Sequence, residues 1–204
     1  IFISTDKATN PSSTLGASKL LAERLTLDAS SHTGENKTIF AIVRFGNVLG
    51  SRGSVFQIFQ KQILTNNPLT VTDERMTRFI MSISDASKMI LKVTNIAKDG
   101  EIFILKMPSV KIEELAKGML NVFKKKFPNH RITNKIKILK SRERERFDEF
   151  LITNEEQVYC HDVGQMYKIS KIENKKPVSL NNFNSKTSKK ISKKELEKII
   201  NELM

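Results

Sequence analysis

The sequence predicts an α/β protein built on a doubly wound sheet with helices on both faces. Three short apolar stretches of strand length, at 1–4, 39–43 and 102–105, are each followed by a segment with helical periodicity. Strands that alternate with helices in this way favour a mainly parallel sheet. With 204 residues, 39% of them hydrophobic, the chain can bury a substantial core.

The first half of the chain supplies two strand–helix pairs. A strand over 1–4 ends in a polar turn at 10–13, and apolar residues at helical spacing then predict a helix over 15–29. The run at 39–43 is continuously apolar, which is typical of a strand covered on both faces. Three glycines follow it, and a helix is expected over 55–64.

The second half continues the alternation. Strand, helix, strand, helix and strand are predicted in turn at 69–71, 85–97, 102–105, 112–127 and 136–139. Ser84 is the expected N-cap of the helix over 85–97. Low apolar content at 171–190 predicts a linker, and Ser192 with Glu195 forms a capping-box pattern before a short amphipathic helix. The organisation is therefore 1–152 as the main domain, 153–170 as the end of the globular part, and 171–204 as a basic linker with a short helix.

Composition excludes several classes of protein. The formal net charge is +13, but no zinc pattern or aromatic-rich RNA motif accompanies the lysines, so a solvated surface is expected rather than a specific nucleic-acid site. Nucleic-acid binding through the basic C-terminal half is kept as an alternative function. The single cysteine, Cys160, fits a reducing cytoplasmic compartment. No apolar run is long enough for a membrane span, and the three histidines lack metal-ligand spacing.

The most informative residues follow the first strand. Thr5, Asp6 and Lys7 place a hydroxyl, a carboxylate and an ammonium at the end of an apolar stretch, where ligands bind in α/β proteins. Such a triplet alone is more often a turn or a cap. Its extension through Asn10-Pro11 to Gly16-Ala17-Ser18-Lys19 makes it specific.

Three further segments carry residues suited to phosphate or sugar. The segment 43–54 reads VRFGNVLGSRGS, in which glycines allow backbone to approach a ligand closely. The segment 72–80 reads TDERMTRFI, and its arginines offer two parallel charged hydrogen bonds to phosphate. The segment 142–149 reads RERERFDE, for which an alternating-charge helix face remains an alternative.

Over residues 1–152 these motifs resemble the extended short-chain dehydrogenase/reductase family. They are most similar to the inverting UDP-N-acetylglucosamine 4,6-dehydratases and the CapD-like polysaccharide biosynthesis proteins. The resemblance implies the C-terminal part of a Rossmann-like domain with a small substrate-binding subdomain. The glycine-rich dinucleotide fingerprint of that family lies in an N-terminal half, and the chain is expected to lack this half.

The resemblance also implies roles for individual residues. Thr5 would orient the sugar, Asp6 would protonate the departing hydroxyl, and Lys7 would act as the base at carbon 5. Lys19 would bind the nicotinamide ribose, and Phe45 and Gly46 would lie beside the nicotinamide. The residues expected to bind substrate are Asn47, Arg52, Thr72, Arg78, Arg142 and Glu145. No metal is expected, and the cofactor would be NADP or NAD.

One residue departs from the family pattern. Leu15 stands where most members have a catalytic tyrosine, and leucine has no proton to exchange. The predicted function is a dehydratase that acts on UDP-N-acetylglucosamine with inversion at carbon 5, for surface polysaccharide or glycoprotein glycan synthesis, in a homo-oligomer. A UDP-sugar 4-epimerase is one alternative. A UDP-sugar-binding homologue without catalytic activity is another, and Leu15 is the main argument for it.

Overall fold

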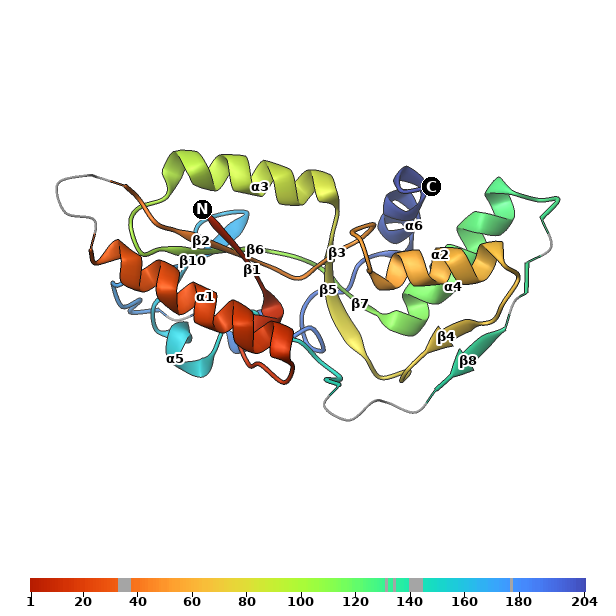
Figure 1. Cartoon of the computed structure of the whole chain (residues 1–204), viewed down its shortest axis with the longest axis horizontal. Coiled ribbons are helices and arrows are strands. Elements are labelled where there is room, and N and C mark those ends of the chain that lie inside the picture. The colour runs from red at the N-terminus through yellow and green to blue at the C-terminus, as the bar shows by residue number, and fades with distance from the viewer. Residues whose placement is uncertain (33–37, 131, 134, 140–144, 177) are drawn as a thin grey trace.

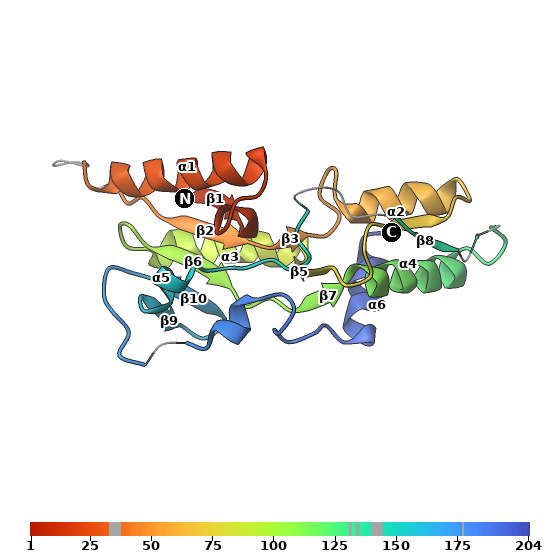
Figure 2. The same ribbon diagram turned by 90° about the horizontal axis from the view of Figure 1, so that it is seen from below.

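The structure, a computed structural model, describes every residue except 33–37, 131, 134, 140–144 and 177. Figure 1 shows two lobes, one around a five-stranded sheet near the N-terminus and one built mainly of helices near the C-terminus. Each lobe has its own apolar core. Figure 2 shows the strands β3 (Asn47–Val48) and β5 (Thr77–Met81) between the two lobes.

The five-stranded sheet has the order β1-β2-β6-β10-β9. Its parallel strands are β1 (Phe2–Thr5), β2 (Ile42–Phe45) and β6 (Ile102–Leu105). An antiparallel hairpin of β9 (Cys160–Asp162) and β10 (Met166–Ile169) completes the sheet beside β6. Thr5 and Phe45 are paired in register, so β1 and β2 end at the same edge. The predicted α/β class is confirmed, and the sheet is mixed, with three parallel strands followed by an antiparallel hairpin.

Helices cover both faces of this sheet. The helix α3 (Ile83–Ile96) lies on one face, and α1 (Thr14–Ser30) and α5 (Asn154–Gln157) lie on the other (Figure 1). A buried stripe at helical spacing (Ala86, Met89 and Val93) packs α3 against the sheet. The cap of α3 is Ser82, whose hydroxyl accepts from the backbone N–H of Asp85, so the predicted cap at Ser84 is wrong by two residues.

The strand β2 contains a buried arginine that the predicted boundary at 39–43 excluded. Arg44 is 1% exposed and faces two carboxylates on the covering helices. Its guanidinium donates to Glu23 of α1 at 2.8 and 3.1 Å and to Glu156 of α5 at 2.9 Å. These contacts tie two helices to one strand.

The second lobe packs α2 (Val55–Leu64), α4 (Ile112–Lys126) and α6 (Lys193–Glu202) around one core. The short parallel strands β4 (Leu69–Val71) and β8 (Ile136–Ile138) border it. Leu196 and Ile200 of α6 are buried against α4 at Gly118, where an added Cβ would lie 3.3 Å from each of them. The terminal helix is therefore part of the body of the protein.

The structure differs from the sequence-based expectation in three further segments. The strands β5 and β7 (Ser109–Lys111) form a small sheet with β3, and neither was predicted. The hairpin β9–β10 was not predicted either. The segment 171–190, predicted to be a linker, contains the short helix η2 (Leu180–Phe183), and Phe183 of that helix is 1% exposed. Tyr167 packs on Phe183 with ring centroids 4.5 Å apart, which anchors the segment to the sheet.

Candidate active site

The end of β1 holds an ion pair of adjacent residues. Thr5 caps the short helix η1 (Asp6–Ala8) and donates its hydroxyl to Asp6 Oδ1 at 3.0 Å. Lys7 Nζ donates to Asp6 Oδ1 at 2.9 Å and to Asn47 Oδ1 at 3.1 Å. The Asp6 side chain is fully buried, and its Oδ2 has no hydrogen-bond partner among the residues that the structure describes. The site thus joins a buried carboxyl with one unused oxygen to a half-buried ammonium.

The first turn of α1 packs closely against the backbone of Lys7 in this ion pair. Gly16 lies so close to the backbone of η1 that an added Cβ would meet the carbonyl oxygen of Lys7 at 2.5 Å. Real Cβ atoms do not approach backbone so closely, so a side chain here would displace Lys7. This explains the glycine in the Gly16-Ala17-Ser18-Lys19 motif on steric grounds.

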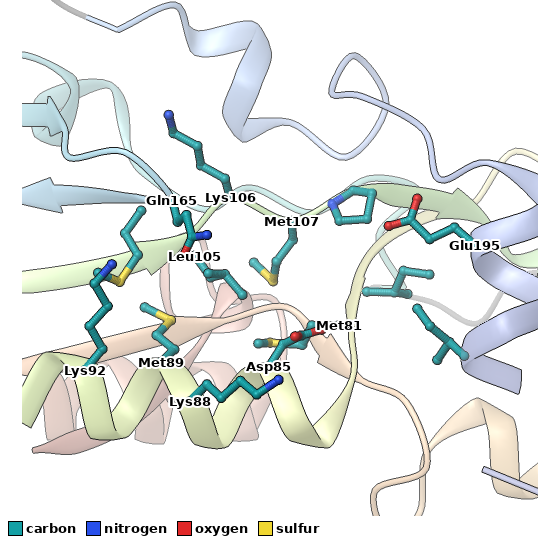
Figure 3. Close-up of a pocket in the computed structure, with 14 residues that line it drawn as sticks. Met81, Asp85, Lys88, Met89, Lys92, Leu105, Lys106, Met107, Gln165 and Glu195 are labelled. Carbon is teal, nitrogen blue, oxygen red and sulfur yellow. The ribbon is translucent and has the colours of Figure 1, made fainter. Parts of the chain in front are cut away.

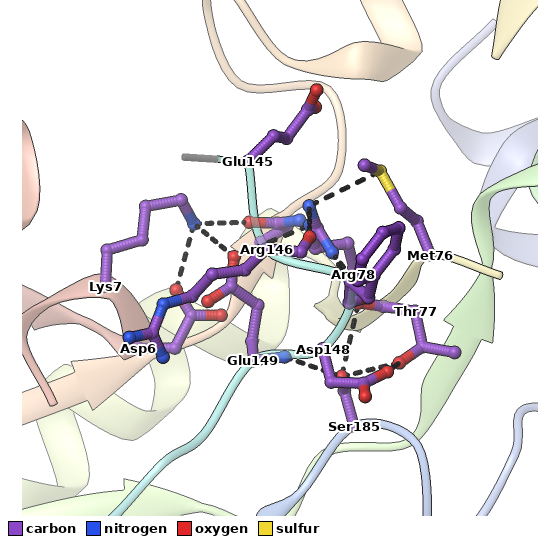
Figure 4. A network of polar contacts seen from close by, with 12 residues as sticks. Asp6, Lys7, Met76, Thr77, Arg78, Glu145, Arg146, Asp148, Glu149 and Ser185 are labelled. Carbon is purple, nitrogen blue, oxygen red and sulfur yellow. Dashed lines mark hydrogen bonds and ion pairs between the residues drawn. The ribbon is translucent and has the colours of Figure 1, made fainter. Parts of the chain in front are cut away.

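A second carboxyl, which the sequence analysis did not assign, lies beside Lys7 (Figure 4). Glu149 is 5% exposed, and its Oε1 is 4.0 Å from Lys7 Nζ and 3.5 Å from Arg78 Nε. Burial raises the pKa of Glu149 above its ordinary value, and the charge of Asp6 adds to this effect, while the nearby cations oppose it. The only sequence signal was its place at the end of the segment 142–149.

Arg78 binds the backbone that carries Glu149. Its guanidinium donates to the carbonyl oxygens of Thr77 at 2.8 Å, Arg146 at 2.9 Å and Phe147 at 3.1 Å. Arg142, which was predicted to bind the substrate, lies outside the described residues. Glu145 is described, and its Oε1 accepts from the Thr72 hydroxyl at 3.4 Å. The segments 72–80 and 142–149 therefore meet in space.

Two cavities with shared lining residues adjoin Lys7 of the ion pair. The smaller, about 240 Å³, is lined by the polar side chains of Lys7, Asn47, Arg78 and Glu149 among others. The larger, about 530 Å³, is lined by Lys7, Asn47 and Arg78 as well. It also brings together most of the remaining predicted positions, namely Phe45, Gly46, Arg52, Thr72 and Glu145.

Lys19 and Leu15 take no part in the ion pair at the end of β1. Lys19 Nζ donates to the carbonyl oxygen of Ile3 at 3.0 Å and lies 4.9 Å from the ring centroid of Phe2, and it lines neither cavity. Leu15 lines the larger cavity and is 57% exposed. The cavity wall at the position of the family's tyrosine is therefore apolar.

The larger cavity has features that suit a flat, amide-bearing ring such as nicotinamide. Gly46 lets β5 approach closely, because an added Cβ would lie 2.5 Å from Phe79 Cβ. Ser4 lines the same cavity, and its buried Oγ has no partner among the described residues. A hydroxyl without a partner beside an aromatic wall can bind a polar group of a planar ligand. The residues present therefore fit that cofactor.

A third cavity lies between the two lobes, against α3 and α6, and Figure 3 shows its lining. Its volume is about 550 Å³, and methionines at 81, 89, 107 and 166 are among its apolar lining residues. None of the predicted site residues lines it. Within the described ranges, no group of His, Cys, Asp and Glu side chains has the arrangement of a metal site, and no helix is long and apolar enough to cross a membrane.

Comparison with known proteins agrees with the fold. Residues 1–171 match the polysaccharide biosynthesis protein family. A protein of Methanocaldococcus jannaschii named "Uncharacterized membrane protein MJ1061" is 43% identical over all of this chain and 61% of its own length. A UDP-glucose 4-epimerase of Rickettsia bellii is 38% identical over 83% of this chain and 48% of its own length. The chain thus spans about half to three fifths of these relatives.

Solved structures show the same architecture. The X-ray structure of Pen from Bacillus thuringiensis superposes with a TM-score of 0.88 at 36% identity, over 99% of this chain and 61% of that one. The dTDP-glucose 4,6-dehydratase DesIV from Streptomyces venezuelae, solved with NAD and TYD bound, has a TM-score of 0.58 at 17% identity, over 72% and 48%. That likeness shows the fold alone. The fold is that of an extended short-chain dehydrogenase/reductase. The chain belongs to the polysaccharide biosynthesis protein family.

Proposed function

We propose that the chain carries the catalytic and substrate-binding part of an NADP- or NAD-dependent dehydratase. The enzyme would convert UDP-N-acetylglucosamine to a 6-deoxy-4-keto sugar with inversion at carbon 5, for surface glycan synthesis. The main support is the 2.9 Å contact between Lys7, which lines both cavities, and the buried Asp6 beside it. Dehydration needs both a base and an acid at adjacent carbons, whereas epimerisation needs no acid for a departing hydroxyl.

The Asp6–Lys7 contact can prepare both groups in one step. Passage of one proton from Lys7 Nζ to Asp6 Oδ1 converts the ion pair into a neutral amine and a carboxylic acid. The amine of Lys7 then takes the proton from carbon 5, and Asp6 gives its proton to the hydroxyl that leaves carbon 6 as water. Thr5 holds the Asp6 carboxyl in place through its 3.0 Å hydrogen bond. A bound nicotinamide supplies the oxidation at carbon 4 and the hydride that returns to carbon 6.

The remaining residues suit a nucleoside diphosphate sugar. Arg78, Arg146 and Lys7 line the smaller cavity together with Glu145 and Glu149, and the three cations favour a diphosphate. Asn47 spans both cavities and can reach the sugar or the diphosphate. Thr72 and Glu145, which contact each other and line the larger cavity, offer oxygens to a ribose.

The relative from Rickettsia bellii supports a second candidate, a UDP-sugar 4-epimerase, since that protein bears this name at 38% identity. One experiment separates the two. The protein, with any natural sequence that precedes or follows residues 1–204, is loaded with NADP or NAD and incubated with UDP-N-acetylglucosamine in deuterated water. NMR and mass spectrometry then follow the sugar.

Each outcome has a distinct meaning. A 6-deoxy-4-keto product with deuterium at carbon 5 supports the dehydratase, and the configuration at carbon 5 tests inversion. A 4-epimer without solvent deuterium replaces the dehydratase by the epimerase. Unchanged sugar, with binding still measurable, contradicts both and favours a sugar-binding protein in which Leu15 marks lost chemistry.

A further inference from the structure

The chain leaves the five-stranded sheet twice beside the candidate site. Gly46 alone separates β2 from β3, and residues 106–108 separate β6 from β7. Both connections lead into the small sheet β3-β5-β7. One side chain joins them, because the buried N–H of Gly46 donates to Met107 Sδ at 3.3 Å, and Met107 is 6% exposed. This thioether therefore links the two points at which the chain passes from one sheet to the other.

The register of the sheet explains why a side chain accepts this hydrogen bond. The N–H of Ile42 donates to the carbonyl oxygen of Glu101, toward β6, at 2.9 Å, and every second N–H of a strand points to the same side. The N–H of Gly46 therefore also faces β6, but β6 ends at Leu105, before the register gives Gly46 a partner. A buried N–H without an acceptor is costly, and a thioether sulfur can accept weakly. Met107 thus extends the hydrogen bonding of β2 by one position.

The Gly46 peptide controls residues on both sides of it. The close approach of β5 requires a glycine here, and glycine restrains its own backbone least of all residues. Phe45 lines the larger cavity, and Asn47 Oδ1 accepts from Lys7 Nζ at 3.1 Å. A turn of the Gly46 peptide would therefore displace both the cavity wall and the amide that holds the ammonium. The contact with Met107 opposes such a turn.

We propose that Met107 is a positioning residue whose sulfur fixes the Gly46 peptide and, through it, Phe45 in the cofactor cavity and Asn47 on Lys7. The expected effect on turnover rests on the proposed function, whereas the expected effect on the backbone does not. Met107 also lines the third cavity (Figure 3). Leucine could fill the same apolar space, so the proposal assigns a role to the sulfur itself rather than to the volume of the side chain.

The first test measures the backbone directly. Met107→Leu keeps an apolar side chain of similar volume and removes the acceptor. Met89→Leu is the matched control, because Met89 lies in the same core cluster, lines the same third cavity and is 3% exposed. Both variants are made in the protein with any natural sequence that precedes or follows residues 1–204.

Hydrogen exchange of the Gly46 amide is then followed by NMR. Labelling with ¹³C-carbonyl phenylalanine and ¹⁵N-glycine selects this amide, since Phe45-Gly46 is the one Phe-Gly pair in residues 1–204. Exchange should be roughly tenfold faster or more in Met107→Leu and unchanged in Met89→Leu. Equal exchange in the natural protein and Met107→Leu overturns the proposal.

The second test changes the sulfur and nothing else. Growth on norleucine replaces the sulfur of every methionine by a methylene group. It should weaken NADP or NAD binding and lower kcat roughly 2- to 10-fold each, the size expected for loss of one hydrogen bond. The same treatment of Met107→Leu reports the other methionines and should add little. Selenomethionine, whose selenium can still accept, should preserve both values.

The outcomes separate this inference from the proposed function. Faster Gly46 exchange and weaker cofactor binding in Met107→Leu, without any 6-deoxy-4-keto sugar from the natural protein, support the role of Met107 and contradict the dehydratase. Formation of that sugar, with exchange and cofactor binding the same in Met107→Leu as in Met89→Leu, overturns the role of Met107 and leaves the dehydratase in place.

Discussion

Replacement of Arg44 by methionine should destabilise the protein more than any change on its surface. Arg44 donates four hydrogen bonds to the carboxylates of Glu23 and Glu156 and a fifth to the carbonyl oxygen of Leu151 at 2.8 Å. Glu23 is only 2% exposed, so the variant would leave its carboxylate buried without its partner. Loss of one member of a buried ion pair costs about 3–5 kcal/mol.

The assay is urea unfolding followed by far-UV circular dichroism, with the free energy of unfolding obtained by linear extrapolation. Arg44→Met/Glu23→Leu should recover part of the loss, because the buried carboxylate of Glu23 is then absent, whereas Glu156 still lacks Arg44 and keeps the N–H of Thr153. Arg75→Met is the control, since Arg75 forks onto Asp73 in the same way but on the surface, and it should change stability little. A loss below about 1 kcal/mol in Arg44→Met would refute the assignment of Arg44 as the link between the sheet and both helices.

The same network predicts a dependence on pH. Burial tends to raise the pKa of Glu156, but hydrogen bonds and charge from Arg44 outweigh it and leave the pKa below its ordinary value. A lowered carboxyl pKa contributes stability that is present above the unfolded value and is lost as the pH falls through the folded value. Arg44→Met should therefore weaken the loss of stability on the acid side of the ordinary glutamate pKa.

Three other predictions test the site and the core. Leu15→Tyr, which adds a hydroxyl to the wall of the larger cavity, should raise turnover if the chain is a weakened dehydratase, and an unchanged kcat would show that the chemistry does not use this position. Gly46→Ala should weaken cofactor binding in a fluorescence titration, because the added methyl meets Phe79 Cβ at 2.5 Å; unaltered affinity would contradict the close-approach argument. Cys160 is fully buried and burial raises its pKa to about 12, so a thiol reagent should modify it only after unfolding, whereas fast reaction of the native protein would show that this part of the sheet opens.

Local patterns predicted most of the elements because periodicity depends on neighbours in sequence. The helices at 55–64 and 112–127 match the observed Val55–Leu64 and Ile112–Lys126 closely. The strand predicted at 39–43 lies at Ile42–Phe45 instead. A charged residue normally ends a buried strand, and the prediction therefore stopped before Arg44. Two glutamates, distant in sequence, make its burial possible, and no local pattern reveals them.

The sequence by itself determined the α/β class and the set of polar residue types at the end of the first strand, since both follow from residue types at short spacing. Only the tertiary structure decided which other groups surround Lys7. Glu149 reaches it because Arg78 and Ser185 hold the backbone of its segment at the cavity floor. Docking of Leu196 and the terminal helix on Gly118 was decided in the same way. Contacts of this kind join residues that are distant in sequence. They depend on shape and charge that only the folded chain brings together, so no local sequence pattern predicts them.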